Sequence, residues 1–425
     1  MSLSTRPSIH ASSPSRRDGR PHHRHLPRPV RPSTVALLLG VSLLGVWTGP
    51  LSGQADSTLA QEGLYDRPFI GSVSSTSVGG YVEGNTNYFV EDGVSEGFSM
   101  ELRRFNVFLF SQVSQRIRFL AELEFEHGTE EIALETALVD FQIRPSLVLR
   151  GGIILPPVGY LNQNHDSPQW DFVDRPLVTT DVIPSTLSEV GFGLYGKVPA
   201  GGLVLSYDAY LTNGLQDGVV GNSVGRTDIP SGKTDGLFGE DNNGSPAISG
   251  RVAARKPGLG EIGLSYYGGH YNAFRVEGQE VDERRWLGIT ALDAGAEVGS
   301  VQLRSEVAYA TIDVPPGMTE LFGDRQWGGY LDVLMPVWHP RFLGYTDAVL
   351  SVGLRLERVD YNVGNFSSTG RAIGDEVTAL VPGVSFRPTS GTVFRANYRY
   401  HWTTDLQGND PSRLAGFQLG FATYF

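Results

Sequence analysis

The chain has no cysteine and only three lysines, Lys197, Lys233 and Lys256, among its 425 residues. The lack of cysteine excludes a disulfide framework and a thiolate metal site. The part of the chain after residue 60 lacks the 3.6-residue apolar period of amphipathic helices. The one sustained apolar run of the whole sequence is residues 35–47. Glycine, by contrast, is abundant at 53 residues, with 17 tyrosines, which suits a protein of strands and turns.

The apolar run at residues 35–47 predicts a secretory signal. Its 13 residues are fewer than the roughly 20 that a helix needs to span a bilayer, and arginines precede it while small residues follow it. Cleavage after Ala55 or Ala60 is expected, so residues 1–60 are assigned to the leader and residues 61–78 to a short periplasmic segment. Loss of the leader removes seven arginines and two aspartates and leaves 27 basic and 44 acidic side chains, which argues against nucleic-acid binding.

From residue 79 onward, segments of about ten residues show alternating apolar and polar side chains. In one of them Phe119 and Leu123 belong to the apolar face, and Arg118 and Glu122 to the polar face. Such alternation is typical of strands that have one face in an apolar environment. Sixteen strands are predicted, over residues 79–89, 98–110, 116–126, 133–143, 147–155, 191–198, 203–212, 247–256, 260–269, 286–298, 301–311, 326–336, 346–358, 375–387, 392–402 and 415–425.

The connections between these strands alternate in length. Tight links rich in proline, glycine and serine, such as 144–146 and 299–300, alternate with long ones, such as 156–190 and 213–246. Short periplasmic turns and long extracellular loops are typical of bacterial outer-membrane barrels, whereas a soluble sandwich has no reason to sort its loops in this way. The predicted fold is therefore all-β, a transmembrane antiparallel β-barrel of about 16 strands over residues 79–425.

The end of the chain fits the same prediction. Residues 415–425 read AGFQLGFATYF, with Phe417, Leu419, Phe421 and Phe425 on one face of the expected strand. A final strand leaves an open sheet edge unless it pairs with another strand, and an even number of strands lets it close on the first. This ending resembles that of bacterial outer-membrane barrels, in which the terminal aromatic is recognised by the insertion machinery, so Phe425 is expected to contact that machinery.

Residues 100–214 resemble the family of phosphate-selective porins O and P. The matching pieces are ELRR at 101–104, IRFLAE at 117–122, LRGG at 149–152, PPVG at 156–159, DRPLV at 174–178, EVGFGLYG at 189–196 and TNG at 212–214. The resemblance implies sixteen strands, a homotrimer that passes small solutes, and an inward constriction loop after the fifth strand. The longest predicted connection, 156–190, occupies that place. Phosphate-selective members also carry a lysine cluster near the mouth, and because lysine is scarce here the resemblance does not extend to phosphate selectivity.

With the apolar faces toward lipid, the charged side chains of the polar faces are predicted to line a water-filled lumen. The predicted pore-lining residues are Arg104, Arg118, Glu122, Glu124, Arg150, Arg251, Arg255, Arg304, Glu306, Arg355, Arg395 and Arg399. The predicted constriction loop adds Asp166, Asp171, Asp174, Arg175 and Asp181. Acids on the loop that face arginines on the wall would create a field across the channel. Alternatively, these charges pair with one another and solvate the lumen.

These patterns predict an outer-membrane porin for passive diffusion of small hydrophilic solutes or ions, with anions such as phosphate among the candidates. The alternative is a barrel that acts as a surface adhesin or binding scaffold through its long loops. No catalytic residue, metal or cofactor is predicted, because GRTDIPSGKT at 225–234 has the wrong glycine spacing for a phosphate-binding loop and the histidines after the leader show no ligand spacing. Expected partners are outer-membrane lipid, small solutes and further copies of the chain.

Overall fold

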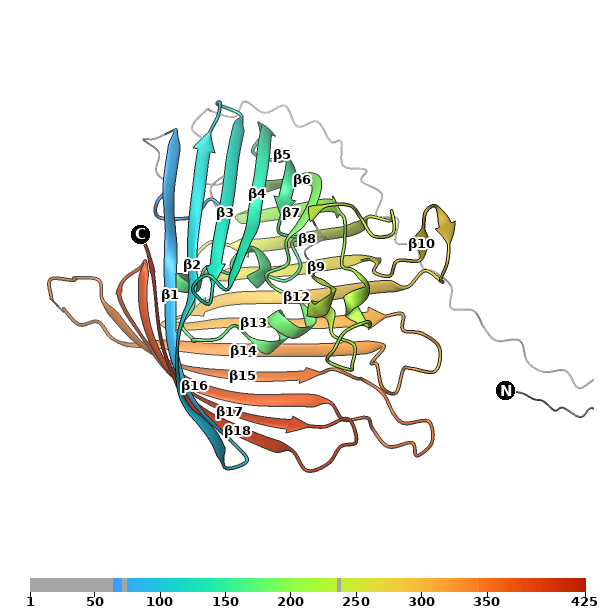
Figure 1. Ribbon diagram of the computed structural model, residues 1–425. Coiled ribbons are helices and arrows are strands. Elements are labelled where there is room, and N and C mark those ends of the chain that lie inside the picture. The colour runs from blue at the N-terminus through green and yellow to red at the C-terminus, as the bar shows by residue number, and fades with distance from the viewer. Residues whose placement is uncertain (1–63, 71–74, 235–237, 342) are drawn as a thin grey trace, which may run out of the picture. The chain divides into compact units, whose positions relative to one another are not determined.

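Sixteen antiparallel strands close into a β-barrel (Figure 1). The computed structural model describes residues 64–70, 75–234, 238–341 and 343–425, so the predicted leader lies outside the described residues. Among the described residues, no helix is long and apolar enough to cross a membrane. The predicted fold class and the number of strands are confirmed.

The strands lie close to the ranges that the alternating pattern predicts. They are β1 (Thr76–Glu91), β2 (Val94–Gln112), β3 (Ile117–Glu126), β4 (Glu131–Arg144), β5 (Leu147–Ile154), β6 (Glu189–Ala200), β7 (Leu203–Thr212), β8 (Ala247–Lys256), β9 (Gly260–His270), β12 (Trp286–Val298), β13 (Val301–Ile312), β14 (Arg325–Trp338), β15 (Val349–Asp360), β16 (Glu376–Thr389), β17 (Thr392–Thr404) and β18 (Ser412–Tyr424). A small hairpin of β10 (Arg275–Val276) and β11 (Gln279–Glu280) stands apart from the barrel sheet. Short helices lie in two long loops: η1 (Leu161–Gln163), η2 (Ser167–Gln169), η3 (Val178–Val182), η4 (Asp217–Val219) and η5 (Ile229–Gly232).

The barrel closes where the sequence predicts, through pairing of β18 with β1. The register places Tyr424 opposite Tyr81 and Leu419 opposite Thr86. Two further backbone hydrogen bonds join Phe425 and Gly80, at 3.0 and 3.2 Å. Closure satisfies the backbone groups of both edges, which a strand inside hydrocarbon requires because lipid offers no hydrogen-bond partners.

Tight turns follow from local backbone chemistry. The β12–β13 hairpin turns through only Gly299 and Ser300, with Val298 directly opposite Val301. Gly299 has φ +63°, a left-handed conformation that glycine adopts without steric cost and that two-residue hairpin turns require. This short link separates two predicted strands at the point where the sequence breaks its alternation.

The barrel wall exposes apolar side chains on its outer face and buries charged ones on its inner face, the reverse of a soluble protein. On β3, Leu123 is 36% exposed while its neighbour Glu122 is fully buried, and on β12 Leu292 is 49% exposed while Asp293 is 3% exposed. A soluble sheet buries leucine and exposes carboxylates. An apolar outer face around a polar interior is typical of barrels that stand in lipid.

The inner face changes character along some strands. On β12, Asp293 lies toward the short-turn end, and Ala291, Ile289 and Leu287 follow it, all buried, toward the long-loop end. These apolar side chains belong to a cluster that includes residues of two long loops, namely Val158, Val178, Val182, Ile183, Leu187, Leu215, Val219 and Ile229. The expectation of a water-filled lumen therefore fails in the long-loop half of this wall, where loop side chains fill the interior.

Candidate functional site

The long segment between β5 and β6 carries η1 to η3 and folds into the barrel; it belongs to the green part of the ribbon in Figure 1. Its backbone contacts widely separated strands: the Gly159 N–H donates to Ser265 Oγ of β9 at 2.8 Å, and the Leu177 N–H donates to Glu357 Oε2 of β15 at 2.6 Å. The segment predicted as an inward constriction loop thus lies in the interior, and we refer to residues 155–188 as the inner loop.

Arginines on the wall hold the inner loop through its backbone carbonyls. Arg355 Nη1 donates to the Asp174 carbonyl at 2.7 Å, and Arg395 Nη1 donates to the Phe172 carbonyl at 2.9 Å. The Arg355 guanidinium also makes a two-pronged ion pair with Asp332, at 2.7 and 2.8 Å, and lies 4.5 Å from the centre of the Phe172 ring. Two of the predicted pore-lining arginines therefore anchor the loop.

The loop acids contact arginines directly. Asp171 accepts from Arg387 Nε and Ser385 Oγ, both at 2.9 Å. Asp174 accepts from Arg103 at 2.8 Å and also from Arg399. Arginines at contact distance therefore neutralise these two carboxylates. At Asp171 and Asp174 the structure shows the second of the two expectations, paired charges, and not a field across an open channel.

The pKa values of these two carboxyls follow from their surroundings. Burial raises the pKa of Asp174, but the guanidinium groups of Arg399 and Arg103 outweigh it, so the pKa lies well below its ordinary value. Burial likewise raises the pKa of Asp171, and Arg387 reverses the shift to a lowered value. Both side chains are therefore ionised at neutral pH and remain paired there.

The remaining predicted loop residues bind within the interior in other ways. Asp181 accepts hydrogen bonds from the Tyr361 hydroxyl and, at 2.7 Å, from Thr180 Oγ1, and burial raises its pKa. Arg175 Nη1 donates to Thr186 Oγ1 of the same loop at 3.1 Å. Among the residues that the structure describes, neither side chain meets a partner of opposite charge at hydrogen-bond distance.

The sequence does not predict that residues 64–70 also lie inside the barrel. Tyr65 is buried and its hydroxyl donates to Asp140 at 2.6 Å. Arg67 is buried too, makes a two-pronged pair with Asp166 of the inner loop at 2.8 and 2.9 Å, and lies 4.0 Å from the centre of the Phe108 ring. The described part of the predicted periplasmic segment therefore contacts the inner loop and the wall, a packing for which the local sequence carries no periodic signal.

Two further arginines that bind the inner loop were missed by sequence reasoning. Arg103 is the extra residue of a β-bulge, because Glu83 pairs with Arg104 and the next residue, Gly84, pairs with Leu102. A bulge interrupts the two-residue period, which explains how neighbouring arginines both turn inward. Arg387 and Ser385 both donate to Asp171 and are two residues apart on β16, so they lie on the same face of the strand. The inward direction of Arg387 could therefore have been predicted by extending the two-residue period to the end of β16.

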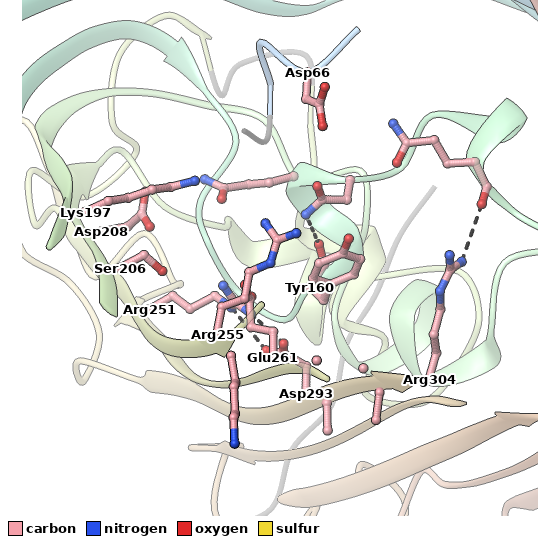
Figure 2. A pocket seen from close by; sticks show the side chains of 18 of the residues that line it. Asp66, Tyr160, Lys197, Ser206, Asp208, Arg251, Arg255, Glu261, Asp293 and Arg304 are labelled. Carbon is pink, nitrogen blue, oxygen red and sulfur yellow. Dashed lines mark hydrogen bonds and ion pairs between the residues drawn. The ribbon is translucent and has the colours of Figure 1, made fainter. Parts of the chain in front are cut away.

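A cavity of about 490 Å³ lies on one side of the inner loop (Figure 2). Its basic lining residues are Arg150, Lys197, Arg251, Arg255, Lys256 and Arg304, and its acidic ones are Asp66, Asp208, Glu261, Asp293 and Glu297. Four of the predicted pore-lining arginines thus meet in one cavity. Tyr160 and Asn164 of the inner loop form part of the opposite boundary.

Two of the four arginines in the cavity make ion pairs with carboxylates, and a third donates to a backbone carbonyl. Arg150 makes a two-pronged pair with Asp140, both contacts at 2.8 Å. Arg251 Nη2 lies 2.5 Å from Asp293 and 2.8 Å from Glu261, while Arg304 donates to the Gln169 carbonyl at 3.4 Å. The cavity thus presents alternating charges held in fixed positions, suited to hydrated ions and polar solutes.

The predicted wall residues Arg104, Arg118, Glu122 and Glu124 form a second charged region, on β2 and β3. Arg104 contacts Glu83 and Glu124 at 3.1 Å and Glu126 at 2.7 Å. Arg118 donates to the Tyr195 hydroxyl at 3.0 Å. In the same region, Glu122, Glu135 and His165 offer ligand atoms within 4.8 Å of one another. Glu306 lies apart from these residues, on β13, against Gly159 of the inner loop.

Comparison with known proteins supports the fold. No protein-family model matches the chain, so membership of the phosphate-selective porin family is not confirmed. An uncharacterized protein of Aquifex aeolicus (strain VF5) is 28% identical over 362 residues, which cover 80% of this chain and 78% of that protein.

Solved outer-membrane proteins share the architecture. The anion-selective porin from Comamonas acidovorans matches with a TM-score of 0.53 and 15% identity, covering 83% of this chain and 99% of that one. The outer membrane channel DcaP of Acinetobacter baumannii gives a TM-score of 0.51 and 11% identity over 82% of this chain and 97% of its own. The trimer form of OmpT of Vibrio cholerae gives a TM-score of 0.51 and 11% identity, covering 83% of this chain and 100% of that one. At such low identities the likeness establishes the fold: the chain has the architecture of bacterial outer-membrane porins.

Proposed function

We propose that the chain is a channel of the bacterial outer membrane through which small hydrophilic solutes and ions diffuse passively. The observation that carries this proposal is the charged cavity between the inner loop and the wall of a closed barrel with an apolar outer surface. Charged groups fixed in a narrow interior let hydrated solutes pass while they exclude apolar ones. The solved porins with the same architecture support the proposal.

A weak preference for anions follows from the lining. The cavity carries six basic and five acidic side chains, whereas the whole chain has a net charge of −12. Positive charge is thus concentrated where solutes would pass, but pairing of Arg150 and Arg251 with carboxylates limits the excess. The name of the Comamonas porin, anion-selective, agrees with this direction.

The test is electrical. The full chain, refolded in detergent and inserted into planar bilayers, is expected to give single-channel conductance and a reversal potential that indicates weak anion preference. Arg255→Glu, which reverses a charge in the cavity, is expected to shift the reversal potential toward cations. Arg284→Glu is the matched control, because Arg284 is exposed beside Glu280 in an outer hairpin.

Two results contradict the proposal. A correctly folded barrel without conductance would remove the channel function, and an equal shift in both variants would mean that the cavity is not the path. The adhesin alternative gains no support from the solved structures that the barrel resembles. We assign no enzymatic step to the chain.

The cellular setting belongs to the same proposal. An exported chain with a cleaved leader of residues 1–60, recognition of Phe425 by the insertion machinery and a homotrimer are proposed from the sequence, and the trimeric OmpT neighbour is consistent with the assembly. Unheated native gels and membrane fractionation test these points directly.

A further inference from the structure

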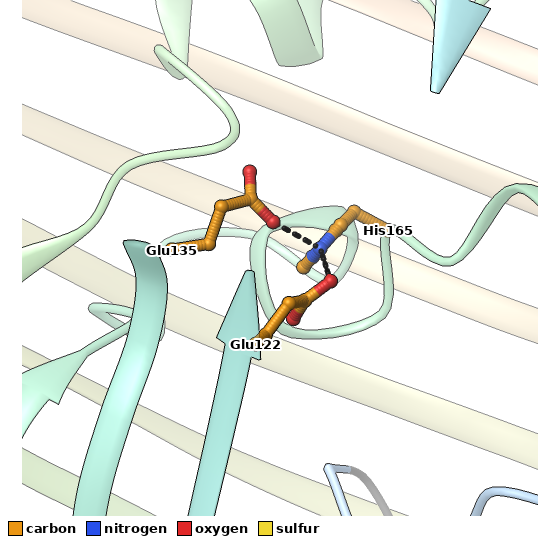
Figure 3. A group of neighbouring side chains, drawn as sticks. All are labelled: Glu122, Glu135 and His165. Carbon is orange, nitrogen blue, oxygen red and sulfur yellow. Dashed lines mark hydrogen bonds and ion pairs between the residues drawn. The ribbon is translucent and has the colours of Figure 1, made fainter. Parts of the chain in front are cut away.

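Three ligand-type side chains from separate elements converge inside the barrel (Figure 3). Glu122 comes from β3, Glu135 from β4 and His165 from the inner loop. His165 Nε2 lies 3.1 Å from Glu135 Oε2 and 3.6 Å from Glu122 Oε1. The three residues are at most 6% exposed, so the ligand atoms meet in a site screened from bulk water.

The imidazole is oriented by its other nitrogen. His165 Nδ1 lies 3.1 Å from the Asn162 carbonyl oxygen, so Nδ1 carries a proton and Nε2 faces the carboxylates. Asn162 is fixed in turn, because its amide donates to the Pro156 and Leu187 carbonyls and accepts from the Leu187 N–H. A backbone carbonyl that holds the far nitrogen of a histidine is the usual support of a metal-binding imidazole.

The Glu122 carboxylate is also held in place, and one of its two oxygens makes no hydrogen bond. The Asn106 amide donates to Glu122 Oε1 at 2.8 Å, while Glu122 Oε2 is buried and makes no hydrogen bond. Arg67 Nη2 lies 3.7 Å from this oxygen, but it donates its hydrogen bond to Asp166 Oδ1 at 2.9 Å. One buried oxygen of Glu122 is therefore left without a hydrogen bond, and burial of a polar atom without a hydrogen-bond partner is costly.

Two of the three separations between the ligand atoms fit a tetrahedral ion, and the third is within 4.8 Å. Zinc bonds of about 2.0–2.1 Å to nitrogen and oxygen place neighbouring ligand atoms roughly 3.3 Å apart. The observed separations of 3.1 and 3.6 Å from His165 Nε2 lie on either side of that value. Imidazole with carboxylate oxygen is a donor set that suits zinc, with water at the remaining position.

We propose that Glu122, Glu135 and His165 bind a zinc ion that fastens the inner loop to β3 and β4. Binding needs neutral imidazole and two ionised carboxylates, so any proton on Nε2 leaves to solvent as the zinc–nitrogen bond forms. The ion would tie a segment distant in sequence to the wall next to the Arg67–Asp166 pair. This inference goes beyond the proposed function and does not depend on conductance.

The test measures metal in the folded full chain without an affinity tag. The protein is refolded with equimolar zinc and dialysed, and zinc is counted by mass spectrometry. We expect one zinc per chain, and we expect Co²⁺ in its place to give the visible absorption of a tetrahedral site. His165→Gln and, separately, Glu135→Gln are each expected to reduce retained metal at least tenfold.

The matched control is His127→Gln. His127 also faces a carboxylate, with Nδ1 3.0 Å from Glu101 Oε1, but it is half exposed and has one acidic partner. This variant is expected to retain zinc. Zinc content below a tenth per chain in the unaltered protein, or equal content in all variants, would overturn the proposal and leave His165 as an imidazolium paired with Glu135. Gel mobility of the unheated barrel shows in each case that the protein has folded.

Discussion

At the residue scale, some positions of the interior leave no room for a larger side chain. Gly159 opens the inner loop with φ +68°, and a Cβ atom at this position would lie 1.8 Å from Glu306 Oε1. The residue must therefore be glycine for two separate reasons, its backbone conformation and its close approach to the wall.

Gly159→Ala separates these two reasons when it is compared with Gly93→Ala. Gly93 also has a positive φ, +88°, but nothing lies within 4 Å of a Cβ atom there. We expect Gly93→Ala to lower the free energy of unfolding by about 1 kcal/mol, because alanine is strained in the left-handed conformation. Gly159→Ala should cost more, by about 1–3 kcal/mol, since the methyl group meets a buried side chain. Urea unfolding in detergent measures both, and equal losses would show that the loop does not press on Glu306.

At the element scale, the strands were predictable and the position of the inner loop only in outline. A two-residue period is a local property, so alternation located the wall, and the length of segment 156–190 indicated an inward loop. Its partners could not be predicted from the sequence, because Asp171 meets Arg387 and Asp174 meets Arg399 across more than 200 residues of chain. The zinc ligands have no sequence spacing for the same reason: they come together only when the loop packs on β3 and β4.

The anchors of the inner loop predict how the channel responds to acid. The pKa values of Asp171 and Asp174 are lowered in the folded chain. A carboxyl group whose pKa is lowered by folding stabilises the folded state fully at any pH above its unfolded pKa of about 3.9. This stabilisation is lost as the pH falls from that value toward the lower pKa of the folded state. With a chelator present to remove any bound metal, we therefore expect the two anchors at Asp171 and Asp174 to hold the loop, and the conductance that depends on them to stay constant, from pH 7 to about pH 4.5. A change should appear only at lower pH, as the loop is released.

Asp174→Asn should release the loop at neutral pH, because Arg103 and Arg399 lose their shared carboxylate. The expected result is noisier or altered conductance at pH 7, recorded in planar bilayers. Asp324→Asn is the control, since Asp324 pairs with Arg325 in an exposed position. Conductance that changes already between pH 7 and 5, or an Asp174→Asn trace like that of the unaltered channel, would contradict the anchoring role.

At the scale of the whole molecule, the barrel separates two environments with one layer of chain. The outer face carries exposed leucine, valine and phenylalanine, and the inner face carries arginine and carboxylates that pair with each other and with the loop. The pattern predicted this division because neighbouring residues face opposite sides of a strand. It did not predict the apolar cluster in the long-loop half, because a buried inward residue and a lipid-facing one look alike in a sequence when both are apolar.

The position of the lipid belt gives a quantitative test of the whole arrangement. Leu292 lies at the middle of β12, faces outward and is 49% exposed. An arginine on the lipid face near the membrane midplane costs about 2–4 kcal/mol. We expect Leu292→Arg to lower the free energy of unfolding from lipid vesicles by that amount. Val276→Arg, on the outer hairpin β10 at 53% exposure, should change it by less than about 0.5 kcal/mol. If the two variants unfold with equal free energies, Leu292 does not stand in hydrocarbon and the barrel does not cross a membrane at β12.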